Sequence, residues 1–159
     1  MKRLVTLLVT ALLMTAALCV SASAADYQSA AEDLSAIGMF RGTVSGGFEL
    51  DRAPKRSEAA IMLVRLYGAE EEAAAAYQSG EISHPFKDVG PIASPYVAWL
   101  YTKGITKGAT ATTFNSNAAC TDKNYVVFLL RALGYEDGKD FQYADCLNFA
   151  AGLGFYDAS

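Results

Sequence analysis

The sequence predicts an all-α fold built from repeated helix-loop-helix units, and two observations lead to this prediction. The first is an internal repeat, because five residues recur at a constant offset of 66 positions without a gap. They are Gly38, Gly42, Phe48, Arg65 and Gly68, which return as Gly104, Gly108, Phe114, Arg131 and Gly134. The second is that apolar residues at helical spacing precede the glycines in each copy, while neither copy shows the pattern of a long strand.

The N-terminal residues 1–24 have the organisation of a secretory signal peptide. A basic start is followed by an apolar run over 4–20 and by the small residues Ala22, Ser23 and Ala24. The run is at the short end of the ~20 residues that span a bilayer. Cys19 is preceded by Leu18, where a lipidated cysteine normally follows a small residue. We therefore expect a secreted protein that has no membrane attachment after cleavage before Ala25.

The first repeat, 26–68, contains two expected helices and a loop. Ala30, Leu34 and Ile37 share one face of the first helix, and Gly38 is placed to cap it in the left-handed conformation. The loop over 41–55 carries Phe48, which we expect to be buried. The second helix, about 56–67, has an apolar stripe made of Ala59, Met62, Leu63 and Leu66.

The second repeat, 86–134, follows a linker at 69–85 that begins with an Ala- and Glu-rich helix over 69–77. Ser94 and Pro95 are the expected N-cap and first residue of its first helix, which ends at Gly104. Phe114 lies in the loop over 107–121. The apolar residues of its helices are Val97, Leu100 and Tyr101 in the first, and Tyr125, Phe128, Leu129 and Leu133 in the second, about 122–133.

Residues 135–159 predict an incomplete third repeat. They contain one apolar helix, about 143–153, but neither the loop nor the second helix of the other two copies. We expect an exposed apolar face on this helix, formed by Leu147, Ala150 and Leu153. If the chain is complete, such a face predicts association with a second copy, or instability.

Composition excludes several classes of function. The net charge of −4 becomes −6 after residues 1–24 are removed, which argues against nucleic acid as a partner. His84 is the sole histidine, so neither a His-based metal site nor a Ser-His-Asp triad can be assembled. We expect no enzymatic activity, no catalytic residue, no cofactor and no metal. Whether Cys120 and Cys146 pair in a disulfide is left open.

Three segments match an ordered family pattern. They are Phe86-Lys87-Asp88-Val89 with Trp99, Gly104-Ile105-Thr106-Lys107-Gly108, and Lys55-Arg56-Ser57-Glu58. The first two segments lie in the second repeat, and the third begins the second helix of the first repeat. With these motifs the chain resembles the S-layer homology (SLH) family, secreted cell-surface repeat proteins of Gram-positive-type bacteria.

The resemblance implies a pseudo-threefold bundle of repeats whose grooves bind secondary cell-wall polysaccharide, often through a pyruvyl ketal. It also implies that the motif Arg is the principal ligand contact, a role that falls on Arg56, with Lys55 and Glu58 in support. The second repeat departs from the motif, because Asp122 replaces the Arg and Asn124 the Glu.

The residues themselves leave alternatives open. Arg56 either binds an anion at a helix N-terminus or is a solvated helix-start residue, with Glu58 as a simple cap. Trp99 either stacks on a sugar ring or packs in the core, and Arg65 and Arg131 favour structural roles. The chain either binds wall glycan or is a degenerate repeat domain that contacts other surface proteins.

Overall fold

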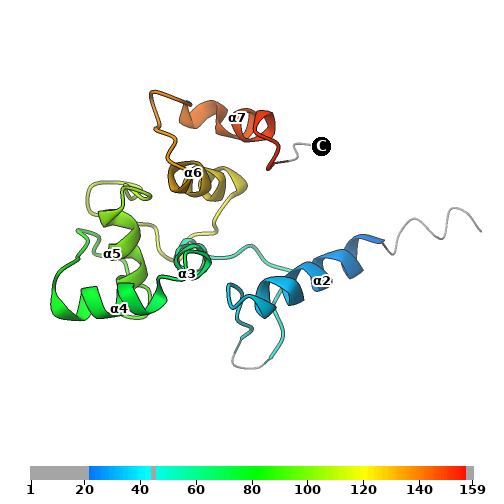
Figure 1. The fold of residues 1–159 in the computed structure, drawn as a ribbon, viewed down its shortest axis with the longest axis horizontal. Helices are drawn as coiled ribbons and strands as arrows, with labels where there is room; N and C mark the ends of the chain where they lie inside the picture. Colours follow the sequence, from blue (N-terminus) through cyan, green and yellow to red (C-terminus); the bar gives the residue numbers. More distant parts are fainter. Residues whose placement is uncertain (1–21, 44–45, 157–159) are drawn as a thin grey trace, which may run out of the picture. The chain divides into compact units, whose positions relative to one another are not determined.

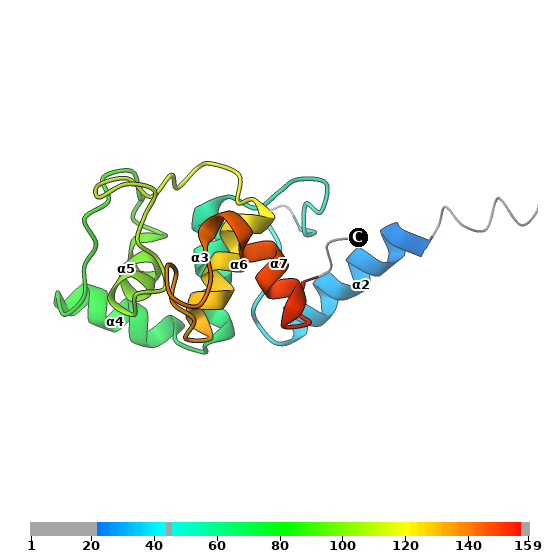
Figure 2. The same ribbon diagram turned by 90° about the horizontal axis from the view of Figure 1, so that it is seen from above.

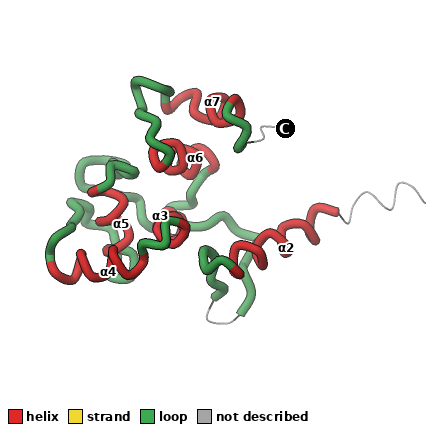
Figure 3. The backbone as a smooth tube through the Cα atoms, in the orientation of Figure 1, coloured by secondary structure: helices red, strands yellow, loops and turns green. Residues whose placement is uncertain are grey.

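The computed structural model describes residues 22–43 and 46–156. Over these residues the chain forms six α-helices and one 3-10 helix, with no strand (Figures 1 and 3), so the all-α prediction is confirmed. The α-helices are α2 (Ala22–Ala36), α3 (Arg56–Leu66), α4 (Glu70–Ser79), α5 (Ser94–Thr102), α6 (Asp122–Ala132) and α7 (Cys146–Gly152). The 3-10 helix, Tyr143–Asp145, leads directly into α7.

The chain divides into two compact units, 1–50 and 51–159, which are described separately. Most of the predicted signal peptide lies outside the described residues, and the expected cleavage point falls in the first turn of α2. Among the described helices, none is long and apolar enough to cross a membrane.

In the first unit, Gly38 has a φ of +75°, as expected for a left-handed residue after α2. Phe48 is half-buried and stacks on Phe40, with ring centroids 5.2 Å apart. The predicted apolar face of the helix is wrong. The helix ends at Ala36, so Ile37 lies in the turn beyond it and is 66% exposed.

In the second unit, α3 and α6 begin at the predicted residues Arg56 and Asp122. Each ends one residue before its predicted end, and Gly68 and Gly134 follow with positive φ. Helix α5 begins at Ser94, which is therefore inside the helix rather than its N-cap.

The main core joins α3, α4 and α5 with the loop that carries Phe114. Leu63 and Val64 of α3, Ala73 of α4 and Leu100 of α5 are fully buried in it, and so is Phe114, as predicted.

A second core lies between α6 and α7. Val127 and Leu130 of α6 are buried there together with Cys146 and Ala150 of α7. The stripe predicted for α6 packs on the main core through Tyr125, Phe128 and Leu129, and only Leu133 departs from it, being 63% exposed. The side of α6 that is buried against α7 was not predicted. The exposed face predicted for α7 is wrong at Ala150, which α6 covers.

The two cores show the same pairing of helices. Helix α3 packs on α5, and α6 packs on α7 (Figures 1 and 2), so the second helix of each repeat contacts the first helix of the next. Cys120 and Cys146 are both buried and free.

Candidate functional site

A cavity of about 390 Å³ lies where the start of α3 meets α6 and the Phe114 loop of the second repeat. Its polar lining residues are Arg56, Thr106, Asn115, Asn124, Arg131 and Tyr143. No carboxylate is among the described residues that line it. The cavity therefore combines two guanidinium groups with neutral amide and hydroxyl groups.

The start of α3 is bound to the loop of the second repeat. The backbone N–H of Arg56 donates to the carbonyl of Ala118 at 2.9 Å, and that of Ser57 to the carbonyl of Ser116 at 3.1 Å. The first N–H groups of a helix have no partner within the helix, so these carbonyls satisfy two of them. The sequence-based expectation that free N–H groups bind an anion here does not hold for these two positions.

The side chain of Arg56 is held by the aromatic residues of the site. Arg56 is 7% exposed, and its Nε donates to the carbonyl of Phe114 at 2.9 Å. Its guanidinium carbon lies 4.9 Å from the ring centroid of Phe114 and 5.2 Å from that of Phe128. Burial lowers the pKa of Arg56. Among the described contacts its side-chain hydrogen bond uses Nε, which leaves the two terminal nitrogens for a ligand.

Asp88, in the opening of the second repeat, positions the loop that lines the cavity. Its Oδ1 accepts from the N–H of Phe114 at 2.7 Å and its Oδ2 from the N–H of Ser116 at 3.0 Å. Burial acts to raise the pKa of Asp88, but these backbone N–H groups hold it below its ordinary value. The sequence places Asp88 in a family motif but does not indicate this role.

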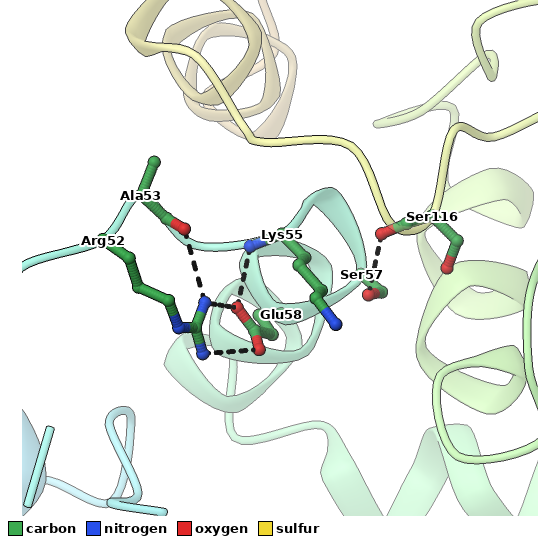
Figure 4. A network of polar contacts seen from close by, with 6 residues as sticks. All are labelled: Arg52, Ala53, Lys55, Ser57, Glu58 and Ser116. Carbon is green, nitrogen blue, oxygen red and sulfur yellow. Dashed lines mark hydrogen bonds and ion pairs between the residues drawn. The ribbon is translucent and has the colours of Figure 1, made fainter. Parts of the chain in front are cut away.

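Glu58 acts as a cap, as Figure 4 shows. Its carboxylate accepts from the backbone N–H of Lys55 at 2.7 Å and binds both terminal nitrogens of Arg52, at 2.8 and 3.0 Å. Lys55 is exposed. Neither Lys55 nor Glu58 lines the cavity.

Trp99 is a core residue of the second unit. It is 6% exposed, its Nε1 donates to Oε1 of Glu72 at 2.9 Å, and its ring contacts that of Tyr67. It borders a separate hollow together with Glu72 and Lys103, and it does not line the Arg56 cavity.

The N-terminus of α6 contributes neutral groups to the cavity. Thr121 caps the helix by accepting from the N–H of Asn124, and Oδ1 of Asn124 accepts from the Tyr143 hydroxyl at 3.2 Å. Asp122, which replaces the motif Arg in the second repeat, is exposed and does not line the cavity. In this repeat the motif residue that lines the cavity is Asn124.

Arg131 was expected to be structural, yet it lines the cavity from the C-terminal part of α6. Its Nη2 lies 3.2 Å from a carboxylate oxygen of Asp137. Only the tertiary structure brings Arg131 and Arg56 to one cavity. No group of three or more potential metal-ligating side chains occurs within the described ranges 22–43 and 46–156.

Residues 85–121 match the family model of the S-layer homology domain. The match covers the Asp88 opening, α5 and the Phe114 loop, but neither α3 nor α6. No curated protein matches the chain.

Proposed function

We propose that the chain attaches a secreted protein to the cell wall without a covalent bond. Residues 85–121 match the S-layer homology domain, and such domains generally anchor proteins at the cell wall or surface. The ligand is an anionic, pyruvylated secondary wall polysaccharide, and it binds in the Arg56 cavity. The observation that carries this proposal is a cavity lined by two arginines and no described carboxylate.

The environment of Arg56 supports anion binding. A guanidinium group presents a planar fork of donors that matches a carboxylate, and stacking on two rings fixes its orientation before the ligand arrives. The amides of Asn115 and Asn124 and the Tyr143 hydroxyl border the same space and suit sugar hydroxyl groups. One charged substituent on a neutral sugar fits this combination.

The proposal extends to the whole chain. Residues 1–24 direct secretion, and 26–68, 86–134 and 135–159 are two repeats and part of a third that form a pseudo-threefold arrangement. The protein acts as a binding module rather than an enzyme.

The test is co-sedimentation of residues 25–159 with purified cell-wall sacculi, before and after chemical removal of the secondary polymer. Arg56→Gln is expected to abolish the polymer-dependent pelleting, because the anion loses its principal donor. Arg52→Gln is the matched control, since Arg52 is near α3 but its guanidinium binds Glu58 outside the cavity. Circular dichroism checks that each variant is folded.

A second candidate is a structural or protein-binding module, and a different feature favours it. An apolar hollow of about 540 Å³ lies between the C-terminal ends of α3 and α6, bordered by Leu66, Tyr67 and Leu133, which are exposed. Exposed apolar surface of this kind is typical of protein contacts. A folded protein that does not pellet with intact sacculi would favour this candidate over glycan binding.

A further inference from the structure

We propose that Arg131 is a second ligand-binding residue of the Arg56 cavity, so that one anionic substituent is bound by guanidinium groups from two different repeats. This inference rests on the proposed function and deepens it. It gives Arg131 a role in binding, whereas the sequence favoured a structural role for this residue.

The hydrogen bonds of Arg131 leave part of its guanidinium group unused. Nη2 pairs with Asp137 at 3.2 Å, and Nη1 lies 3.5 Å from the carbonyl oxygen of Ile105, at the limit for a hydrogen bond. The Nε atom is buried without a hydrogen-bond partner among the described residues. Leaving a buried donor without a partner is destabilising, so the contacts within the protein do not by themselves account for this placement.

The second argument is electrostatic. Arg56 and Arg131 line the same cavity, and no carboxylate is among the described residues that line it. Burial is the main cause that lowers the pKa of Arg56, and the positive charge of Arg131 lowers this pKa further, so the two guanidinium groups repel each other. A bound anion would remove that repulsion and gain two charge-assisted contacts.

The third argument is a comparison within the chain. Arg65 occupies the position equivalent to Arg131 in the first repeat. The Nε of Arg65 donates to Glu70 at 3.2 Å, and Arg65 does not line the cavity. The arginine at this repeat position is thus paired within the protein in the first copy and partly unpaired beside a cavity in the second. The second repeat has Asp122 at the position of the motif Arg, and Arg131 supplies the cation from the other end of the helix.

The test measures binding of a methyl glycoside that carries a 4,6-O-pyruvyl ketal, by calorimetry, with its uncharged methyl ester as the ligand control. Arg131→Gln is expected to weaken binding of the acid by roughly tenfold or more, since hydrogen bonds to charged groups contribute about 1.5–3 kcal/mol. Arg65→Gln is the matched protein control and is expected to bind as the wild type does. Binding of the ester is expected to be weak to every variant.

The outcomes separate the two proposals. Wild-type affinity in Arg131→Gln, together with lost binding in Arg56→Gln, would overturn the role of Arg131 alone. A folded wild-type protein that binds neither the glycoside nor the sacculi would overturn the proposed function, and the role of Arg131 with it. If Arg131→Gln does not fold, Arg131→Lys replaces it, because lysine keeps the charge and lacks the fork of donors. Full affinity in that variant would also reject the inference.

Discussion

At the residue scale, Asp88 links the family motif to the geometry of the cavity. Its two carboxylate oxygens accept from the backbone of Phe114 and Ser116, so they fix the loop that also accepts hydrogen bonds from the start of α3. Through this loop, Asp88 supports the contact between the second repeat and α3 of the first. Asp88 does not line the cavity, so the structure gives it a supporting position behind the cavity wall.

We predict that Asp88→Asn lowers the free energy of unfolding by about 1 kcal/mol at neutral pH, because the amide offers a single oxygen to two N–H donors. The stabilisation by Asp88 is fully present above the ordinary pKa of an aspartate in the unfolded chain, and it is lost as the pH falls through the lower pKa of the folded state. Urea denaturation between about pH 7 and about pH 2.5 should thus show that the free energy of unfolding falls less on acidification in Asp88→Asn than in wild type. Asp33→Asn, on the exposed surface of α2, is the control, and parallel curves for Asp88→Asn and wild type would contradict the assignment.

The site could be predicted from the sequence only in part. Arg56 follows from the motif, but its burial between Phe114 and Phe128 does not, because these rings come from another repeat. Arg131 shares its repeat position with Arg65, and only the packing of α6 shows which of the two borders a cavity. The role of Asp88 likewise depends on a loop 26 residues away.

At the element scale, two glycines in one turn have different physical requirements. Gly104 and Gly108 both have positive φ, +73° and +78°. A Cβ atom at Gly104 would meet no heavy atom within 4 Å, whereas one at Gly108 would lie 2.2 Å from Cε1 of Phe86. The first glycine is needed for backbone conformation, and the second also for the close approach of the Phe86 ring.

We predict that Gly104→Ala costs about 1–2 kcal/mol of stability, the usual cost of a left-handed alanine. Gly108→Ala should cost clearly more, since the ring of Phe86 and the backbone carbonyl oxygen of Thr110 would both have to shift. Chemical denaturation of both variants measures the difference. Equal losses would show that both groups shift freely and that the turn is needed only for its backbone conformation.

The ends of α3 and α6 could be predicted from the sequence because glycines and caps are local signals. The buried faces of the helices could be predicted less well. Helix α6 contacts the main core through Phe128 and α7 through Val127 and Leu130, so two of its sides are apolar for different partners. A search for a single stripe identifies one side and cannot assign the other to a helix that comes later in the chain.

At the scale of the whole molecule, a single repeat does not contain its own core. Helix α5 buries Val97 and Leu100 against α3 of the preceding repeat, while α6 buries Leu130 in the core that it forms with α7 of the next. The segment 85–121 that matches the family includes α5 but none of these partner helices. Stability in such a protein comes mainly from the contacts between neighbouring repeats.

We therefore predict that a fragment of residues 51–159 folds and unfolds cooperatively in urea, because both cores and the Arg56 cavity lie within it. A fragment of residues 85–121 should lack a cooperative transition, since Leu100 and Phe114 would be exposed once α3 and α6 are removed. Far-UV circular dichroism during urea titration compares the two fragments. A cooperative transition in the shorter fragment would mean that α5 and the Phe114 loop form a stable core by themselves, and the pairing of helices across repeats would then not be the main source of stability.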